Sequence, residues 1–386
     1  GLTPLIVDTQ RPYQDIDFFR TAPEEYARIE IEPHDPGLII YTSGTTGKPK
    51  GAILTHKNLV HDAKNVIHVW EISATDVLCH ALPLFHVHGL CFALQTALVA
   101  GAQVLMLDQF SPEGVIAVLS KKEAQSSCTV FMAVPSMYAK LIECVGDKRL
   151  NFEHMRLWTC GSAPLLPQDF ERIYKTFGKQ PVEREGMTET GMNFSNPLRG
   201  KRKPGSIGYP LPDLDVRIVD PDSGTDVAPG QTGEIWLKGP AVTPGYWRKP
   251  EANAETFDAQ RWMKTGDVGR VDEDGFLFIT GRIKEIVIRG GENIFPGEIE
   301  QAAYEMPQVL ETVVFGVPDA AMGEELAMVL YLSPGENLDE GEVRAFLNNR
   351  LASYKVPRHI QFWERPLPQN ASGKLHKLKT REMFLG

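Results

Sequence analysis

The segment that decides how this chain is interpreted is Tyr41-Thr42-Ser43-Gly44-Thr45-Thr46-Gly47-Lys48-Pro49-Lys50-Gly51. It combines four serine or threonine hydroxyls, three glycines and two lysines within eleven positions. Glycines let backbone N–H groups approach an anion closely, hydroxyls donate hydrogen bonds to phosphate oxygens, and lysines add positive charge. The segment therefore predicts a polyphosphate-binding loop.

This loop differs from a Walker A motif, which requires Gly-x-x-x-x-Gly-Lys followed by Ser or Thr. Here Thr42 occupies the position of the first glycine, Pro49 follows Lys48, and residues 52–55 predict a strand rather than a helix. A flexible Ser/Gly linker is the alternative interpretation. It is less favoured because the loop directly follows residues 37–41, which have the pattern of a short buried strand.

The composition of the 386-residue chain is that of a globular protein, with 42% hydrophobic and 23% charged residues. The formal net charge of -10 argues against a nucleic-acid-binding surface, which is normally basic. The five cysteines form no Cys-x-x-Cys pair, which indicates reduced thiols. Neither a signal peptide nor an apolar run of about 20 residues is found, so we expect a cytoplasmic protein without a membrane span.

Two changes of pattern divide the chain. Up to about residue 180, apolar strands alternate with helical segments, which predicts an α/β domain with a largely parallel sheet. Short alternating strands at about 205–280 predict a β-rich subdomain, and the chain after Arg282 predicts a compact α+β unit. We therefore expect a large α/β domain over residues 1–283 and a small C-terminal α+β domain over residues 284–386.

Together with the motifs that follow it, the loop resembles the signature of the adenylate-forming superfamily, which includes acyl-CoA synthetases, adenylation domains and luciferases. The family's motifs occur in the expected order between residues 38 and 374. The resemblance implies an enzyme that binds ATP and Mg²⁺, with Thr45 close to the metal. The loop residues that it assigns to ATP or AMP binding are Thr42, Ser43, Gly44, Thr45, Thr46, Gly47 and Lys50.

Two motifs are expected to surround the acyl group. Residues 82–89, Leu-Pro-Leu-Phe-His-Val-His-Gly, match the family segment beside the carboxylate pocket, in which His86 would orient the substrate carboxylate. A single histidine is more often a satisfied core residue, so this role depends on the order of the motifs. Residues 161–164 match a turn that contacts adenine and floors the acyl pocket. The adenine turn is Gly161, Ser162, Ala163 and Pro164, and the expected acyl pocket is Phe85, His86, Gly161, Arg184 and Met192.

The segment Gly186-Met187-Thr188-Glu189-Thr190 is the strongest of the later motifs. By resemblance, Thr188 helps to bind phosphate and Glu189 coordinates Mg²⁺, for which one carboxylate together with ATP phosphates is sufficient. The chain departs from the family at Glu185, where an aromatic residue commonly stacks on adenine. We expect Glu185, Gly186 and Met187 to contact the nucleotide, and this substitution to affect the affinity for ATP.

The remaining motifs lie on both sides of the expected domain boundary. By resemblance, Asp267 accepts hydrogen bonds from the ribose hydroxyls, which suits a carboxylate, and Arg282 has a similar role. Lys284 corresponds to the hinge, and Lys374 corresponds to the lysine that bridges the acyl carboxylate and the α-phosphate. The loop that would enter the active site for thioester formation contains Gly290, Gly291 and Glu292.

These motifs predict an AMP-forming acyl-CoA synthetase that uses ATP, Mg²⁺ and coenzyme A. The acid would first form an acyl-adenylate with release of pyrophosphate, and the acyl group would then pass to the CoA thiol. Two alternatives stay open: a ligase that loads a carrier protein, and a non-catalytic nucleotide sensor with the same fold. The expected catalytic residues are His86, Thr188, Glu189 and Lys374.

The middle of the chain, at 155–246, resembles malonyl-CoA synthetases, so the expected substrate is a short or medium acid with malonate among the candidates. A dicarboxylate needs a cation for its second charge, because a buried unpaired carboxylate is costly. Arg184 is one candidate, and Glu185 beside it would oppose this role by neutralising it. Family members also carry a substantial subdomain before the loop. A missing layer would expose apolar surface or require a partner or a second copy of the chain.

Overall fold

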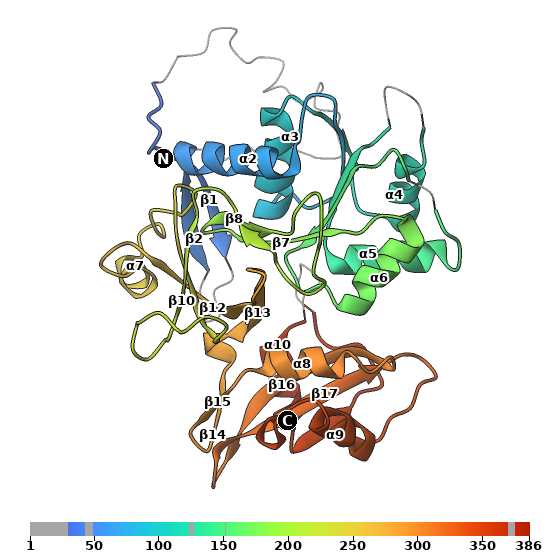
Figure 1. The fold of residues 1–386 in the computed structure, drawn as a ribbon, viewed down its shortest axis with the longest axis vertical. Helices are drawn as coiled ribbons and strands as arrows, with labels where there is room; N and C mark the ends of the chain where they lie inside the picture. The colour runs from blue at the N-terminus through green and yellow to red at the C-terminus, as the bar shows by residue number, and fades with distance from the viewer. Residues whose placement is uncertain (1–29, 43–48, 123–126, 151, 370–374) are drawn as a thin grey trace.

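The computed structural model describes residues 30–42, 49–122, 127–150, 152–369 and 375–386. Within these residues, a seven-stranded sheet has the order β4-β3-β5-β6-β7-β8-β9 (Figure 1). The first five strands in this order are parallel, and β8 and β9 continue the sheet in antiparallel orientation. The strands are β3 (Val77–His80), β4 (Gln103–Met106), β5 (Val130–Ala133), β6 (Leu157–Gly161), β7 (Val182–Met187), β8 (Gly191–Ser195) and β9 (Tyr209–Pro210).

The helices that connect these strands cover both faces of the sheet. The chain moves from β3 outward to β4 and then back across to β5, β6 and β7. Right-handed crossovers therefore place η2 and α3 on one face and the later helices on the other. α2 contacts η2, α3 and β8 on the first face, and α5 contacts both α4 and α6 on the second. The helices are α2 (His56–Trp70), η2 (His88–Gln95), α3 (Thr96–Val99), α4 (Pro112–Leu119), α5 (Pro135–Val145) and α6 (Pro167–Phe177).

A separate antiparallel pair, β1 (Pro36–Thr42) and β2 (Lys50–Thr55), flanks the predicted phosphate loop. The prediction of strands at 37–41 and 52–55 is confirmed, but the prediction that the first is buried is wrong. Ile39 is 36% exposed and Tyr41 is 66% exposed, because only one side of this two-stranded pair packs against the core. Thr55 then caps α2 through a capping box with Asn58, which fixes where the helix begins.

The β-rich subdomain consists of a four-stranded antiparallel sheet with the order β10-β11-β12-β13. Phe194, Ile235 and Leu277 are among the buried side chains of its core. This confirms the change of pattern expected at about 205–280. The elements are β10 (Asp215–Val219), β11 (Gly233–Lys238), α7 (Pro250–Thr256), β12 (Met263–Val271) and β13 (Leu277–Arg282).

The small C-terminal domain has its own sheet and core, so the predicted α+β unit is confirmed. Its sheet has the order β15-β14-β17-β16, and β18 pairs with β17. The proposed boundary between residues 283 and 284 stays a prediction. No helix in the described part of the chain has the length and apolarity of a membrane span. The elements are η3 (Ile283–Glu285), β14 (Val287–Arg289), β15 (Glu292–Ile294), α8 (Pro296–Ala303), β16 (Val309–Asp319), β17 (Gly323–Leu332), α9 (Glu340–Asn348), η4 (Ser353–Lys355), β18 (His359–Phe362) and α10 (Lys377–Leu385).

Candidate active site

The turn between β7 and β8 carries the strongest of the predicted motifs. Glu189 in this turn is only 7% exposed. The Tyr246 hydroxyl donates to Glu189 Oε1 at 2.9 Å, and the Thr243 N–H donates to the Glu189 carbonyl oxygen at 2.7 Å. Burial raises the pKa of the Glu189 carboxyl, and the bond from Tyr246 opposes that rise. A neighbouring cation would favour the ionised carboxylate, which is the form that binds a metal.

The two ends of the predicted phosphate loop lie beside this carboxylate. Thr42 and Lys50 pair across the β1–β2 strands. The Thr42 side chain also opposes the rise in the pKa of Glu189. Lys50 Nζ lies 5.2 Å from the centre of the Tyr246 ring. The structure therefore brings Thr42, Lys50 and Glu189 together. The remaining predicted loop residues lie outside the described part of the chain: Ser43, Gly44, Thr45, Thr46 and Gly47.

Oxygen atoms near Glu189 suit a hard cation such as Mg²⁺. Thr190 Oγ1 is buried and has no hydrogen-bond partner among the described residues, and Thr188 lies in the same turn. The described residues contain no group of three or more His, Cys, Asp or Glu side chains able to hold a metal. Mg²⁺ binding here would therefore combine Glu189 and a hydroxyl with phosphate oxygens from ATP, as this ion commonly does.

The predicted ribose-binding pair is assembled across two antiparallel strands. Asp267 on β12 pairs with Arg282 on β13, and Arg282 Nε lies 2.8 Å from Asp267 Oδ1. Glu185 and Asn193 line a small cavity together with Asp267, and Asn193 Nδ2 donates to Glu185 Oε2 at 3.0 Å. Burial raises the pKa of Glu185 to about 7, and the charge of Asp267 adds to the rise. The residue that departs from the family is thus a half-buried acid next to the predicted ribose site, where Met187 also lines the cavity.

Arg184 lies on the other face of β7 from Glu185, because successive side chains alternate across a strand. A Cβ atom on Gly161 would lie only 2.8 Å from Arg184 Nε, so the absence of a side chain there makes room for the guanidinium group. Arg184 Cζ lies 5.4 Å from the centre of the Phe92 ring. Burial lowers the pKa of Arg184 to about 10, which leaves it charged near neutral pH.

The Arg184 guanidinium lacks hydrogen-bond partners within the described part of the chain. The side chain is 2% exposed, and none of its three nitrogen atoms has a hydrogen-bond partner among the described residues. The charge of Glu185 opposes the lowering of the Arg184 pKa by burial, and the expected neutralisation of Arg184 by Glu185 stays a prediction. A buried guanidinium with five unsatisfied N–H groups is costly. This position therefore suits an anionic group of a ligand.

The turn after β6 contacts the 82–89 segment through His88. Ser162 has a φ of +68°, and its Oγ lies 3.2 Å from His88 Nδ1. His88 is buried, whereas His86 is exposed and its ring centre lies 4.6 Å from that of Phe85. The roles predicted for His86 and Phe85, which is 67% exposed, stay predictions. Ala163 and Pro164 follow Ser162 in the same turn, and Gly186 packs closely against Phe92.

The small domain presents its predicted thioester loop away from the large domain. Gly290 and Gly291 both have positive φ and form the turn between β14 and β15, which Figure 1 shows at the far end of the small domain. Glu292 begins β15, and the predicted hinge residue Lys284 is exposed within η3. Lys374, the predicted bridging lysine, lies outside the described residues.

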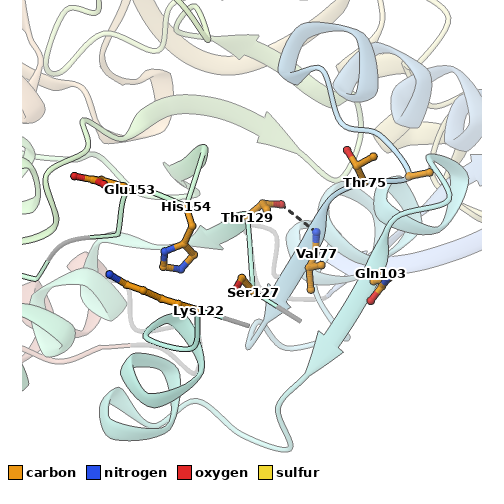
Figure 2. A pocket seen from close by; sticks show the side chains of 9 residues that line it. Thr75, Val77, Gln103, Lys122, Ser127, Thr129, Glu153 and His154 are labelled. Carbon is orange, nitrogen blue, oxygen red and sulfur yellow. Dashed lines mark hydrogen bonds between the residues drawn. The ribbon is translucent and has the colours of Figure 1, made fainter. Parts of the chain in front are cut away.

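A larger cavity among the described residues lies elsewhere. It has a volume of about 910 Å³ and lies where β3, β4 and β5 begin, at the opposite edge of the sheet from the β7–β8 turn (Figure 2). Figure 2 shows Lys122, His154 and Glu153 around it. None of the predicted site residues lines this cavity. The candidate site is thus defined by its side chains rather than by a large preformed hollow.

Four residues near the site were not assigned a role from the sequence: Asp62, His88, Asn193 and Tyr246. His88 lies within the quoted motif at 82–89, and Asn193 lies within the stretch 155–246 that resembles malonyl-CoA synthetases, so their positions offered a signal. Asp62 and Tyr246 reach the site from segments distant in sequence, and only the fold shows them there.

The chain matches the family model described as AMP-binding enzyme over residues 3–247 and the AMP-binding enzyme C-terminal domain over residues 298–374. The chain therefore belongs to the AMP-binding enzyme family. Within this family it is an acyl-CoA synthetase of the AMP-forming class, because curated CoA ligases are 34–38% identical to it over most of its length.

Three curated relatives illustrate this class. A long-chain-fatty-acid–CoA ligase of Bacillus subtilis is 34% identical over 97% of this chain and 69% of the relative. A mitochondrial malonate–CoA ligase, ACSF3 of Mus musculus, is 37% identical over 88% of this chain and 63% of the relative. A sulfoacetate–CoA ligase of Cupriavidus necator is 38% identical over 90% of this chain and 67% of the relative. The chain thus spans about two thirds of the length of these proteins.

The fold agrees with that of a solved relative. The ATP-bound structure of MatB from Rhodopseudomonas palustris superposes with a TM-score of 0.89 at 39% identity, covering 95% of this chain and 72% of that chain. This similarity confirms the predicted architecture of a large α/β domain and a small C-terminal domain.

Proposed function

We propose that this chain activates a carboxylic acid carrying a second anionic group, by forming its acyl-adenylate and passing the acyl group to coenzyme A. The observation that carries the proposal is the buried Arg184 guanidinium, which has no hydrogen-bond partner among the described residues. A fixed, desolvated cation strengthens the binding of a ligand with a matching anionic group and weakens the binding of a ligand that cannot pair with it. The proposed substrate class is therefore short dicarboxylates, with malonate as an example, and related acids.

Two of the relatives are named for acids of this kind. Malonate and sulfoacetate each combine the carboxylate to be activated with a second anionic group, whereas a long-chain fatty acid does not. The three relatives have similar identity to this chain, so overall similarity does not choose between the substrates. The choice rests on Arg184.

In the first reaction, a carboxylate oxygen of the acid attacks the α-phosphorus of ATP, and the bond to pyrophosphate breaks. Both reactants are anions, so catalysis depends on holding them together and on placing cations around the developing charge. Lys50 and Glu189 would face the phosphates, and Asp267 with Arg282 would hold the ribose. Mg²⁺, when bound at Glu189, would neutralise phosphate charge, and Lys374 would bridge the two reactants.

In the second reaction, the CoA thiol sulfur attacks the acyl carbon, the bond to AMP breaks, and the thiol proton passes to solvent. We assign this step to a second orientation of the small domain, residues 284–386, reached by rotation at Lys284. Gly290 and Gly291 support this assignment, because their β14–β15 turn is exposed and lies far from β7 and β8 in the present orientation (Figure 1). Rotation would replace Lys374 by the loop containing Glu292, which is a known type of hinge switch.

The proposal is tested by ATP–pyrophosphate exchange with the purified protein and acids of graded length and charge. Exchange with malonate at a much higher kcat/KM than with propionate, which has the same number of carbons, is expected. A preference for neutral-tailed acids would contradict the substrate class. Addition of free CoA should then release AMP, whereas exchange without CoA-dependent release would identify a carrier-protein ligase, and no exchange with any acid would identify a sensor.

A further inference from the structure

One aromatic side chain, Tyr246, contacts two charged residues of the candidate site. Its hydroxyl donates to Glu189 Oε1 at 2.9 Å, and its ring centre lies 5.2 Å from Lys50 Nζ, within the range of a cation–π interaction. Tyr246 is 8% exposed and Glu189 is 7% exposed, so the hydrogen bond between them is shielded from water. Tyr246 thus connects the carboxylate of the β7–β8 turn to the residue that begins β2, at the end of the predicted phosphate loop.

The backbone of Tyr246 is held on both sides, which fixes the direction of its side chain. Tyr246 forms an antiparallel bridge with Ala52 on β2, and the Trp247 N–H donates to the Gly51 carbonyl oxygen at 2.8 Å. On the other side, the Asn253 side chain of α7 accepts from the Tyr246 N–H at 2.7 Å and donates to the Tyr246 carbonyl oxygen at 3.3 Å. A side chain anchored in this way loses little further conformational entropy when it holds a neighbour. Tyr246 is therefore a preorganised support.

The hydroxyl and the ring of Tyr246 act on different groups. Burial raises the pKa of Tyr246, and the Glu189 carboxylate adds to the rise, so the hydroxyl keeps its proton and remains a donor. An ionised carboxylate offers about four lone-pair positions. The hydroxyl uses one of them, which restricts rotation of the Glu189 carboxyl group and leaves positions for a cation. The ring instead attracts the Lys50 ammonium to its negative face.

We propose that Tyr246 is a positioning residue for acyl-adenylate formation, whose hydroxyl orients Glu189 toward Mg²⁺ and whose ring holds Lys50 toward the phosphates. This inference rests on the proposed function, in which Glu189 and Lys50 face the phosphates of ATP. A group that hydrogen-bonds to a metal ligand commonly changes metal affinity by about 10- to 100-fold, because it fixes the orientation of that ligand. Tyr246 acts through its two neighbours and takes no part in bond making or breaking.

Two substitutions separate the two contributions. Tyr246→Phe keeps the ring beside Lys50 and removes the hydrogen bond to Glu189. It should raise the Mg²⁺ concentration for half-maximal pyrophosphate exchange by about 10- to 100-fold and leave ATP binding without metal nearly unchanged. Tyr246→Leu removes the ring as well. It should also weaken ATP binding without metal by about two- to fivefold, the size expected for one cation–π contact.

The experiment measures the dissociation constant of ATP by isothermal titration calorimetry, once with saturating Mg²⁺ and once with EDTA, beside the exchange assay. The matched control is Tyr138→Phe. Tyr138 is also buried, its hydroxyl donates to the Thr159 carbonyl oxygen at 2.9 Å, and it lies on α5, outside the candidate site. A second test variant, Asn253→Ala, loosens the backbone of Tyr246 without changing the tyrosine, so it should alter the Mg²⁺ dependence in the same direction.

We expect the gain in ATP affinity from Mg²⁺, the ratio of the two dissociation constants, to fall in Tyr246→Phe and to keep its wild-type value in Tyr138→Phe. An unchanged ratio in Tyr246→Phe would overturn the inference. An equal fall in both phenylalanine variants would overturn it too, because the loss would then reflect general damage to the fold. Where Tyr246→Phe does not fold, the ratio in Asn253→Ala decides in the same way. The ratio is measured without any acid, whereas loss of the malonate preference in the wild type contradicts the proposed function itself.

Discussion

Replacement of Arg184 by leucine tests whether this guanidinium recognises a second anionic group on the substrate. In the wild-type protein the side chain is buried over Gly161 and beside Phe92, and its nitrogen atoms have no hydrogen-bond partner among the described residues. Removing one member of a buried charge pair typically costs about 3–5 kcal/mol. Since about 1.4 kcal/mol corresponds to a factor of ten, Arg184→Leu should lower kcat/KM for malonate by about 10²- to 10⁴-fold.

The assay is ATP–pyrophosphate exchange with malonate and propionate as a matched pair of acids. Propionate offers no second charge, so its kcat/KM should be unchanged or higher in Arg184→Leu, where a costly unpaired cation has been removed. Arg184→Lys serves as a control that keeps the charge but loses the planar fork, and it should give an intermediate malonate value. A similar fall for both acids in Arg184→Leu would refute the reasoning, because it would mean that Arg184 supports the fold or the reaction rather than the tail.

Three further predictions concern other parts of the site. Lys374→Ala should lower the rate of acyl-adenylate formation, measured by pyrophosphate exchange, by about 10²- to 10³-fold. Thioester formation from a supplied acyl-adenylate should largely survive. Equal losses of rate in the two half-reactions would contradict the two-orientation scheme. Glu185→Tyr should lower the KM for ATP, because a ring that can stack replaces a half-buried acid, and an unchanged KM would show that this side chain does not face the base. Asp62→Asn should raise the melting temperature at about pH 8 but not at about pH 4. Burial raises the pKa of Asp62 from 3.8 to about 7, so folding takes up a proton in this window and stability falls as pH rises through it, by about 4 kcal/mol at most.

The architecture was predictable because its signals are local. Alternation of apolar strands and helices up to about residue 180 indicated the parallel sheet, and the short strands at about 205–280 indicated the antiparallel subdomain. The burial of residues 37–41 was not predictable in this way. An apolar run has the same pattern whether one or both of its faces are covered, and in this structure Ile39 and Tyr41 are exposed.

The site was predictable only in part, because several contacts join distant segments. The motif order predicted a common nucleotide site for Thr42, Lys50 and Glu189, and the structure places these residues near one another. Asp62 could not be identified from the sequence, because nothing in α2 shows that its carboxyl group reaches Met192, 130 positions away. The separation of neighbouring Arg184 and Glu185 onto opposite faces follows from strand geometry, but its consequence depends on which side chains cover each face.

The central claim, that two anionic reactants are joined where Glu189, Asp267 and Arg184 converge, is tested most directly by a crystal structure with a stable acyl-adenylate analogue. A sulfamoyl adenosine bearing a malonyl-like dicarboxylic tail is a suitable probe. The account predicts that the ribose binds at Asp267 and that the sulfamoyl linkage of the probe lies in the space between Glu189 and the small domain. It also predicts that the terminal carboxylate lies within hydrogen-bond distance of Arg184. An adenosine bound away from Asp267, or a terminal carboxylate directed away from an Arg184 that still lacks a partner, would contradict it.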